Sequence, residues 1–544
     1  MEVDLTGIAL LRLVLVNKGT AFSYDERAEL ELEGLLPPQV NTLEQQLDRA
    51  YRGYSAEPTP LAKYQFLRAL QDRQEILYYA LLDRHLDEML PIVYTPTVGL
   101  AVQQFSALYQ TPRGLSLSPL NIDRATAVVA SYPLDDVRMI VATDSSAILG
   151  IGDQGYGGLA IPIGKLALYT AAGGVSPFHT MPVALDVGTD REDLLADPFY
   201  LGVRQKRLRG DAYLEFIDRF VAAIHSRWPH AVIQWEDLAK DTAFTVLDRH
   251  LGSPSFNDDI QGTGAIALAG MLRACALRGE PLREQRVVIH GAGAGGIGVA
   301  TAIRDGMIAD GASEADAHAR VLVLDSRGLL VDDRPMDDYK RSFAQPAARV
   351  ADWGGGDLRT VVEKSRATAL LGLSGQAGAF GEDVVRAVAR NTARPIVFAL
   401  SNPTSSCEAT PSDVLRWTDG KALVATGSPF EPVVVGGRAV RIGQGNNAFV
   451  FPGLGQGAIL ARARVITDGM VTAAAHAVAA YTAAHHPGEI YPPVADLPAV
   501  SRLVTAAVVA RAQADGVADA QPDEAAIAQA IWRPQYLPIR RARR

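Results

Sequence analysis

Apolar and polar residues alternate along this chain with two different periods. Over residues 17–89 the apolar side chains recur at roughly helical spacing among charged ones, which predicts an amphipathic layer of helices. From residue 91 onward, short apolar runs such as 138–142 and 180–185 alternate with helix-like stretches such as 164–172. That alternation predicts βαβ units and a parallel sheet.

A second block of the same kind begins near residue 260. Its predicted strands are residues 286–290, 320–324, 369–373 and 395–400. Residues 347–357, which include three consecutive glycines, are predicted to form a surface loop between two of these strands. Beyond residue 471 an Ala-rich pattern predicts helices. We therefore expect an α/β protein with a helical region at each end.

Composition narrows the class of protein. With 544 residues, 48% hydrophobic and 21% charged, the chain is typical of a soluble globular enzyme of two to four domains. Its formal charge of −9 offers no basic face for a phosphate backbone, so we expect no nucleic-acid partner. Cys275 and Cys407 are far apart and lack metal spacing, as in proteins of a reducing cytoplasm.

The chain has an apolar segment near its first residue and an Arg-rich segment at its last residues. Residues 5–16 are apolar, but Glu2 and Asp4 precede them and Arg12 interrupts them, so a signal sequence is not expected. No other segment approaches the length of a membrane span, and we expect a cytoplasmic protein without a membrane partner. The Arg-rich residues 540–544 are expected to form a solvated tail.

A glycine-rich turn follows the predicted strand 286–290. Gly291, Gly293 and Gly296 have the spacing G-x-G-x-x-G, with Gly295 inside the same turn, and a helical run follows at 299–309. In this context the glycines allow a tight turn and a close approach of backbone to pyrophosphate, and the helix N-terminus faces the phosphates. The alternative is a glycine-rich turn without a ligand.

Asp325 ends the next predicted strand, where a carboxylate would hydrogen-bond the ribose hydroxyls. It lies further along the chain than the usual spacing of about 20 residues. A carboxylate there would repel an additional 2′-phosphate and therefore favours NAD over NADP, although Arg327 could reverse that preference.

Four carboxylates occur as two adjacent pairs, Glu236-Asp237 and Asp258-Asp259. Adjacent acidic residues are usually solvated surface charge, but these pairs are flanked by apolar residues that suggest buried strand ends. Carboxylates gathered there would repel one another strongly unless a cation were present. Three of them, with substrate oxygens and water, suit octahedral Mg²⁺ or Mn²⁺.

Several segments, in the correct order and covering nearly the whole chain, together resemble one family, the malic enzymes with their relatives the malolactic enzymes. They are Tyr94-Thr-Pro-Thr-Val-Gly99, Ile148-Leu-Gly-Ile-Gly-Asp153 with Gly164-Lys165-Leu166, Trp235-Glu236-Asp237, Phe256 to Gly264, Leu400-Ser-Asn402-Pro-Thr404, and Gly443-Gln-Gly-Asn446-Asn447.

This resemblance implies roles for individual residues. Glu236, Asp237 and Asp259 would ligate the metal, with Asp258 beside them in the catalytic site and Asp259 also next to the cofactor. Lys165 would be the general base, and its apolar neighbours were expected to lower its pKa toward working pH.

The remaining implied roles concern the acid and the bound molecules. Tyr94 would be the acid that protonates the enol carbon. Asn402, Asn446 and Asn447 would hold the substrate carboxylate, and Asn402 also the nicotinamide, although an Asn in a loop is more often a turn residue.

One position departs from the family pattern. Malic enzymes commonly carry an Arg directly before Ile-Leu-Gly, where it contacts the substrate carboxylate, and this chain has Ala147. Loss of a charged hydrogen bond costs about 1.5–3 kcal/mol, or roughly 10- to 100-fold in affinity, unless a basic residue among Arg204 to Arg209 replaces it. Malolactic enzymes tend to have a small residue at this position.

The expectation that follows is an NAD-dependent enzyme that uses Mg²⁺ or Mn²⁺ to decarboxylate L-malate oxidatively to pyruvate and CO₂. The alternatives are a malolactic enzyme that makes L-lactate with bound NAD, and a non-catalytic NAD-binding regulatory protein. The expected fold is α/β with a helical region over 1–90, a parallel-sheet substrate and metal domain over 91–259, a Rossmann-type NAD-binding domain over 260–470 and a helical region over 471–544. The resemblance also implies a homodimer or homotetramer.

Overall fold

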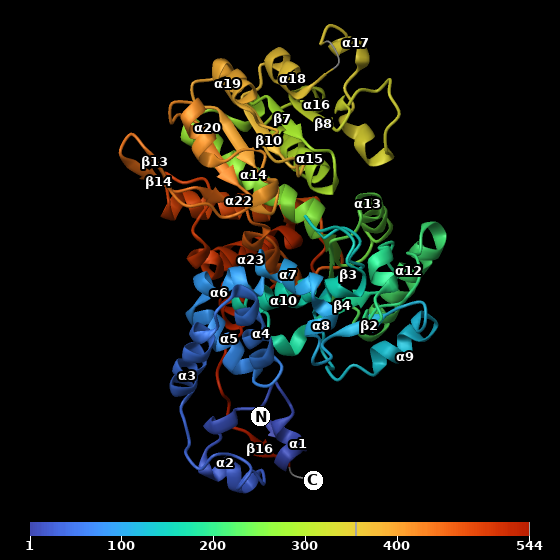
Figure 1. Cartoon of the computed structure of the whole chain (residues 1–544), viewed down its shortest axis with the longest axis vertical. Coiled ribbons are helices and arrows are strands. Elements are labelled where there is room, and N and C mark those ends of the chain that lie inside the picture. The colour runs from blue at the N-terminus through green and yellow to red at the C-terminus, as the bar shows by residue number, and fades with distance from the viewer. Residues whose placement is uncertain (149, 354–355, 543–544) are drawn as a thin grey trace.

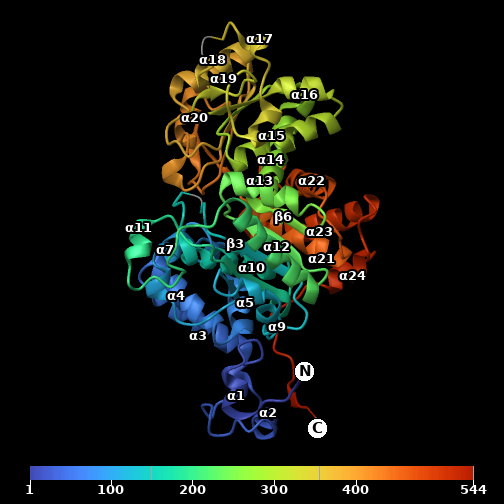
Figure 2. The same cartoon turned by 90° about the vertical axis from the view of Figure 1, so that its right-hand side faces the viewer.

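The structure is a computed structural model that describes residues 1–148, 150–353 and 356–542. Leu149 of the second family segment, Gly354-Gly355 of the expected surface loop and Arg543-Arg544 of the expected tail lie outside the described residues. The remainder has two parallel sheets with helices around and between them (Figures 1 and 2).

Helices occupy most of the chain before the first sheet, as the apolar spacing predicted for residues 17–89, and they continue to residue 108, beyond the predicted helical region. They are α1 (Gly7–Leu11), α2 (Tyr24–Glu29), α3 (Leu43–Ala56), α4 (Pro60–Gln71), α5 (Glu75–Arg84), α6 (Leu86–Val93), α7 (Thr97–Gln103) and α8 (Phe105–Leu108). The hydroxyls of Thr42 and Thr59 accept backbone N–H groups in the first turns of α3 and α4, and Pro60 opens α4. Capping and apolar spacing therefore set the boundaries of these two helices.

The first sheet has five parallel strands in the order β2-β4-β3-β5-β6. They are β2 (Leu115–Leu117), β3 (Met139–Thr143), β4 (Thr180–Leu185), β5 (Val232–Glu236) and β6 (Ser255–Asn257). Helices α9 (Ala125–Ala130), α12 (Gly210–Arg227) and α13 (Lys240–Arg249) belong to the core on one face, α10 (Ala160–Ala171) covers the other, and α11 (Glu192–Ala196) lies in the loop after β4. Every residue of β3 is buried because both faces are covered, and the strand therefore reads as a continuous apolar run.

The second sheet has seven strands in the order β15-β12-β11-β10-β7-β8-β9, all parallel except β9. They are β7 (Val287–His290), β8 (Val321–Asp325), β9 (Gly328–Leu329), β10 (Ala369–Gly372), β11 (Ile396–Ala399), β12 (Leu423–Thr426) and β15 (Gly443–Gln444). The order reverses at β7, which lies between β8 and β10, as in doubly wound nucleotide-binding folds. The predicted Rossmann-type α/β fold is confirmed.

Helices cover both faces of this sheet. The core on one face includes α14 (Thr263–Arg278) and α15 (Ala294–Ala309), and the core on the other includes α18 (Leu358–Ser365), α19 (Glu382–Asn391) and α20 (Pro411–Trp417). The shorter elements are α16 (Glu314–Arg320), α17 (Ala347–Val350) and the hairpin of β13 (Val433–Val435) and β14 (Arg438–Val440). The expected surface loop at 347–357 thus begins with the short helix α17.

The C-terminal helices are α21 (Phe451–Ala461), α22 (Asp468–His485), α23 (Leu497–Ala514) and α24 (Glu524–Gln529). Helix α21 packs on α10 and α23, α23 packs on α22, and α22 packs on α14, so these three helices connect the first sheet to the second (Figure 2). Helix α24 packs on α23.

The chain end is not the free tail expected from its Arg-rich sequence. β16 (Arg540–Arg541) pairs in parallel with β1 (Glu2–Val3), and the Arg541 guanidinium contacts Glu31 at 2.9 Å. Both ends of the described chain therefore meet beside α1 and α2 (Figure 2). Backbone pairing orders the segment although the Arg540 and Arg541 side chains stay exposed.

One helical segment, Asp258–Arg278, is long and apolar enough to cross a membrane by length and composition, contrary to the expectation that none was. Of its most apolar window, 72% is buried inside the protein. A core helix that is surrounded by other elements is apolar on every face, which explains the composition.

Candidate active site

Four carboxylates meet at the carboxyl edge of the first sheet. β5 ends at Glu236 and is followed by Asp237, while neighbouring β6 ends at Asn257 and is followed by Asp258 and Asp259. One oxygen each from Glu236, Asp237 and Asp259 lie within 4.8 Å of one another. Because adjacent parallel strands end at the same edge, the two pairs that are separated in sequence become one cluster.

The backbone of Asp237 helps to fix the cluster. Its φ of +54° is in the left-handed region, which Asp tolerates better than most residues. In this conformation the Asp237 N–H donates to Asp259 Oδ2 at 2.9 Å. One candidate ligand therefore holds the carboxylate of another in place.

Lys165 lies in the middle of α10 and points into the cluster. Its side chain is 0% exposed, and its ammonium donates to Asp258 and contacts Glu236 Oε1 at 3.0 Å. The same nitrogen lies 5.3 Å from the ring centroid of Tyr94 and 4.3 Å from that of Phe451. The lysine is therefore held by two carboxylates and two aromatic rings, away from solvent.

Burial and crowding of negative charge shift the pKa values of this cluster. Burial, with the charges of neighbouring carboxylates, raises the pKa of Glu236 to about 8 and that of Asp259 to about 6. Lys165 contacts Asp258 and Glu236, and the raised pKa values of Glu236 and Asp259 show that gathering these carboxylates in one buried place is unfavourable. A divalent cation would relieve this repulsion, and the donor set of three carboxylates suits Mg²⁺ or Mn²⁺.

The expected lowering of the Lys165 pKa was wrong for the protein without metal. Burial does lower the pKa of Lys165, but the charges of Asp258 and Glu236 outweigh it, and the pKa lies well above its ordinary value. The apolar neighbours of Lys165 in sequence gave no sign of these carboxylates, which lie 71 and 93 residues further along the chain. Tyr94 is also buried, and burial raises the pKa of its hydroxyl, so it keeps its proton at neutral pH.

Gln234 and Tyr169 were not predicted as part of the site. The Tyr169 hydroxyl donates to Gln234, whose amide nitrogen donates to Glu236 Oε2 at 2.7 Å. Gln234 and Glu236 are two positions apart on β5 and therefore on the same face, and this alternation could have identified Gln234. Both side chains orient Glu236 from behind.

The three predicted asparagines have different surroundings. Asn447 donates to Asp258 Oδ2, the oxygen that Lys165 also contacts. Asn446 uses its side-chain oxygen to cap a short helical turn by accepting Ala448 N–H at 2.9 Å. Asn402 accepts the Ser428 hydroxyl at 2.6 Å, and its neighbour Pro403 lies against Gly150. The structure thus brings Asn447 to the carboxylates, whereas Asn402 follows β11 on the second sheet.

The glycine turn joins the second sheet to the carboxylate cluster. Gly291 has a φ of +119°, and a Cβ on Gly296 would lie 1.8 Å from the Gly291 carbonyl oxygen, so both positions require glycine. Gly293 is the N-cap residue of α15, and among the described residues no atom lies within 4 Å of where its Cβ would be. Gly295 faces Asp259, because a Cβ on Gly295 would lie 3.6 Å from the Asp259 carbonyl oxygen. The predicted cofactor turn and metal cluster are therefore adjacent.

Gly298 has a structural role that the motif alone did not identify. A Cβ there would lie 2.2 Å from the carbonyl oxygen of Ile260, so α15 packs directly on the segment that carries Asp258 and Asp259. The glycine run extends past the fingerprint to this residue, which was the available signal.

Asp325 ends β8, as predicted, and it is held by basic residues. Arg334 donates to Asp325 Oδ1 at 2.8 Å, the Arg327 N–H donates to the same oxygen at 2.9 Å, and Lys340 lies 3.6 Å from Oδ2. Burial alone would raise the pKa of Asp325, but these contacts outweigh that effect, and the pKa is lowered. Arg327 thus contacts Asp325 through its backbone, and Arg334 and Lys340 supply the nearby positive charge.

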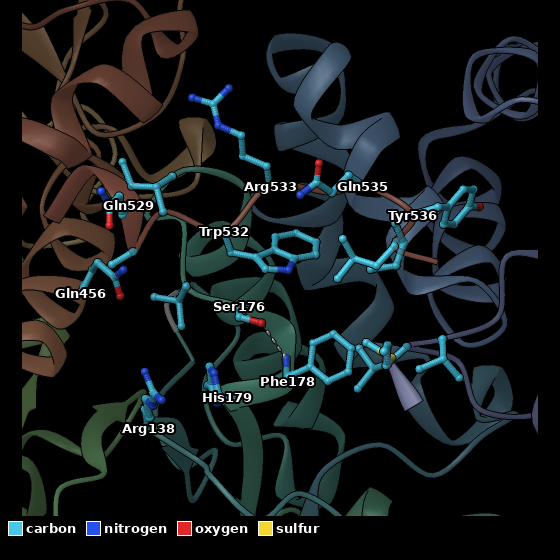
Figure 3. A pocket seen from close by; sticks show the side chains of 18 of the residues that line it. Arg138, Ser176, Phe178, His179, Gln456, Gln529, Trp532, Arg533, Gln535 and Tyr536 are labelled. Atoms are coloured by element: carbon cyan, nitrogen blue, oxygen red, sulfur yellow. Dashed lines mark hydrogen bonds between the residues drawn. The ribbon is translucent and has the colours of Figure 1, made fainter. Parts of the chain in front are cut away.

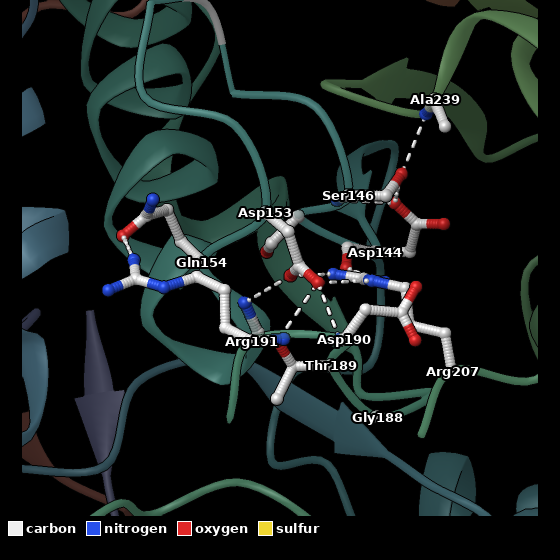
Figure 4. A network of polar contacts seen from close by, with 12 residues as sticks. Asp144, Ser146, Asp153, Gln154, Gly188, Thr189, Asp190, Arg191, Arg207 and Ala239 are labelled. Atoms are coloured by element: carbon white, nitrogen blue, oxygen red, sulfur yellow. Dashed lines mark hydrogen bonds and ion pairs between the residues drawn. The ribbon is translucent and has the colours of Figure 1, made fainter. Parts of the chain in front are cut away.

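Ala147 lies directly beside the carboxylate cluster. Its N–H donates to the carbonyl of Asp237 at 3.0 Å. Of the basic residues at 204–209 that could compensate, Arg207 pairs with Asp153 and donates to the carbonyl of Asp144 at 2.9 Å (Figure 4). Asp153 also accepts the Thr189 hydroxyl at 2.9 Å. Arg207 therefore braces the loop that carries Ala147.

A separate cavity of about 470 Å³ lies beneath the C-terminal segment, between Trp532 and Tyr536 on one side and Ser176 and His179 on the other (Figure 3). None of the residues that line it is a predicted site residue, so this cavity is distinct from the candidate active site.

Comparisons with known proteins agree with this arrangement. Residues 71–251 match the family model described as the malic enzyme N-terminal domain, and residues 260–513 match the one described as the malic enzyme NAD-binding domain. Curated relatives named NAD-dependent malic enzyme include that of Pseudomonas aeruginosa, 47% identical with 98% of this chain and 97% of the relative covered. That of Aeromonas hydrophila is 46% identical, with 99% and 98% covered.

Solved structures show the same fold. The crystal structure of Entamoeba histolytica malic enzyme has a TM-score of 0.57 at 23% identity, with 92% of this chain and 90% of that chain covered. The malic enzyme of Pyrococcus horikoshii has a TM-score of 0.55 at 25% identity, with 82% and 89% covered. Because both domain models match and full-length relatives share nearly half of its residues, the chain belongs to the malic enzyme family.

Proposed function

We propose that this chain catalyses the NAD-dependent and divalent-metal-dependent oxidative decarboxylation of L-malate to pyruvate and CO₂. The observation that carries the proposal is the buried Lys165, fixed between Glu236 and Asp258, beside three clustered carboxylates and a dinucleotide-type glycine turn. Family membership supplies the substrate class, and the names of the relatives support NAD.

Glu236, Asp237 and Asp259 would hold the metal. Their oxygens are close enough to share one ion, and the raised pKa values of Glu236 and Asp259 reflect negative charge that a cation would neutralise. When bound, a divalent metal would polarise the substrate oxygens and stabilise the charge that develops as CO₂ leaves, while NAD would accept the hydride from C2.

Side chains of this protein carry out the proton transfers. Lys165 is charged in the absence of metal, so it must first give up its proton to act as a base, and Asp258 Oδ2 is its contacting acceptor. Neutral Lys165 then takes the hydroxyl proton of malate. Tyr94, which keeps its proton, donates to C3 of the enol and recovers a proton from Lys165 beside it.

An assay of three products tests the proposed reaction. The protein is incubated with L-malate, NAD and Mn²⁺, and NADH, pyruvate and lactate are quantified with and without EDTA. We expect NADH equal to pyruvate, and loss of both with EDTA. Lactate without NADH would instead establish the malolactic reaction, and no product at all would contradict both.

The malolactic reaction is retained as a second candidate because of Ala147. A small residue beside Asp237 leaves no guanidinium for the substrate carboxylate at this point.

We expect Ala147→Arg to lower the KM for L-malate by about 10- to 100-fold, since a charged hydrogen bond contributes about 1.5–3 kcal/mol. Initial-rate kinetics measure the change, with the uncharged Ala147→Gln as control. An unchanged or higher KM in Ala147→Arg would show that substrate does not reach this position.

The preference for NAD is proposed to depend on Asp325. We expect Asp325→Ala to raise the ratio of kcat/KM for NADP to that for NAD by about tenfold or more, because Arg334 and Lys340 lose their carboxylate and become available to a 2′-phosphate. Steady-state kinetics with both cofactors give the ratio. Asp333→Ala, which removes an exposed carboxylate nearby, is the matched control, and an equal effect of both variants would sink the assignment.

We further propose the division of the chain at residue 260 into a substrate and metal domain and an NAD-binding domain, flanked by the helical regions 1–90 and 471–544. A cytoplasmic location is supported by the unbridged, buried Cys275 and Cys407. A homodimer or homotetramer stays a prediction from the family resemblance, and light scattering coupled to gel filtration measures it.

A further inference from the structure

Glu408 is a fully buried carboxylate that no step of the proposed reaction uses. It follows β11 in the loop before α20 and is 0% exposed. Its Oε1 atom accepts three hydrogen bonds, from Ser374 N–H at 2.9 Å, from the Ser374 hydroxyl at 2.9 Å and from the Ser401 hydroxyl at 2.6 Å. Burial of a carboxylate is costly, so its retention calls for a specific role.

The two serines belong to different loops at the carboxyl edge of the second sheet. Ser374 follows β10 and Ser401 follows β11, and the strands β11, β10 and β7 are neighbours. The Ser401 hydroxyl also accepts Gly375 N–H at 2.9 Å. The Glu408 side chain packs against the last residue of β10, since a Cβ on Gly372 would lie 2.4 Å from its Cδ. One carboxylate thus ties the two loops to each other at the end of β10.

Both loops contact predicted cofactor residues. The Gly291 turn lies against the β10 loop, because a Cβ on Gly291 would lie 2.3 Å from the Leu373 carbonyl oxygen and 2.7 Å from Ser374 N. Asn402 is the residue next to Ser401. Nucleotides bind at the carboxyl ends of parallel strands, at the point where strand order reverses. Glu408 therefore lies behind the expected cofactor position and connects its two sides.

We propose that Glu408 is a positioning residue for the nicotinamide cofactor, which acts through Ser374 and Ser401 to hold the Gly291 turn and the Asn402 loop at a fixed separation. The proposal rests on the proposed NAD-dependent function. Two of the bonds to Oε1 come from hydroxyls that could otherwise rotate, and a charged acceptor strengthens such bonds about twofold over a neutral one. Cofactor binding then finds both loops already ordered.

Gln285 offers a matched control at the opposite edge of the same sheet. It has the same side-chain length, is 1% exposed, and accepts the Thr368 hydroxyl at 2.8 Å, so it joins the segment before β7 to the segment before β10. Glu408→Ala and Gln285→Ala therefore each remove a buried side chain that bridges an end of β10 to a neighbouring strand, β11 for Glu408 and β7 for Gln285. Only the first bridge lies at the edge where the cofactor is expected.

Binding of NAD to the full-length protein without substrate tests the proposal, with titration calorimetry for the dissociation constant and thermal melting for stability. We expect Glu408→Ala to raise the Kd for NAD by about tenfold or more and the KM for L-malate by less than threefold. Glu408→Gln, which keeps an oxygen acceptor, should recover most of the affinity. Gln285→Ala should lower the melting temperature while changing the Kd for NAD by less than threefold.

A second set of variants covers the case in which Glu408→Ala does not fold. Ser401→Ala should weaken NAD binding, and in the Ser374→Ala background it should add less than it does alone, because both changes remove hydroxyls from the same bridge. Equal weakening by Glu408→Ala and Gln285→Ala, fully additive effects, or unchanged NAD affinity in a folded Glu408→Ala would each overturn the proposal. Failure of the wild-type protein to bind NAD would instead overturn the proposed function.

Discussion

Lys165→Ala lowers kcat for L-malate oxidation by about 10²- to 10⁴-fold, the range that a positioned general base contributes, while the Kd for NAD changes by less than threefold. This is the expected result because Lys165 is the buried cation that contacts Asp258 and Glu236 and lies beside Tyr94. Stopped assays of pyruvate measure the turnover, and calorimetric titration measures NAD binding.

Loss of a buried lysine also removes an ion pair, so the effect on stability needs its own control. Lys18 is likewise buried and paired, with Glu26, at a place remote in the fold from the carboxylate cluster. Lys18→Ala should lower the melting temperature and leave kcat within about twofold of wild type. A Lys165→Ala enzyme that retained more than a tenth of the wild-type kcat would remove Lys165 from the role of base.

Asp259→Asn has two opposite expected effects. Activity with Mn²⁺ falls by about 100-fold or more, since even residues that merely support a metal ligand contribute about 10- to 100-fold. Stability without metal rises, because one of the crowded buried carboxylates becomes neutral while an oxygen remains to accept the Asp237 N–H. The melting temperature should increase by about 2 °C or more, the shift that roughly 1 kcal/mol produces in a domain of 150–250 residues.

Addition of Mn²⁺ separates this explanation from a general effect of removing charge. The wild-type protein should gain about 2.7 kcal/mol at a metal concentration of 100 Kd, and Asp259→Asn should gain much less. Glu26 is the control, because burial of its carboxylate is outweighed by the contact with Lys18 and by backbone N–H groups, which lower its pKa. Neutralising it in Glu26→Gln should lower the melting temperature and preserve the response to Mn²⁺. A metal-free Asp259→Asn less stable than wild type would refute the charge crowding.

Much of the fold was predictable because the information is local. The strands around residues 139–143 and 287–290 were visible as apolar runs, since strands of parallel sheets are buried on both faces. The glycine turn was visible because its spacing meets the steric needs of Gly291 and Gly296. Placing the acidic pairs after buried strands anticipated their meeting, since neighbouring parallel strands end at one edge.

The electrostatics of the site were not predictable in the same way. The pKa of Lys165 was expected to fall because its sequence neighbours are apolar, yet it rises because Asp258 and Glu236 reach the ammonium from other elements. Among the basic residues at 204–209 that could offset Ala147, Arg207 is engaged by Asp153. In both cases the contacting carboxylate lies tens of residues away along the chain. The apolar periodicity around a residue does not indicate which distant side chain will contact it.

The sequence by itself determined the alternation of helices and strands in two α/β blocks, the dinucleotide turn and the identity of the acidic residues, because each depends on short-range spacing and on residue type. Only the tertiary structure decided that Asn447 meets Asp258 across 189 positions, that the C-terminal helices connect the two sheets, and that Glu408 bridges the loops after β10 and β11. These contacts depend on which strands become neighbours and on which face each helix buries. Packing of the whole chain fixes both, and no local pattern encodes them.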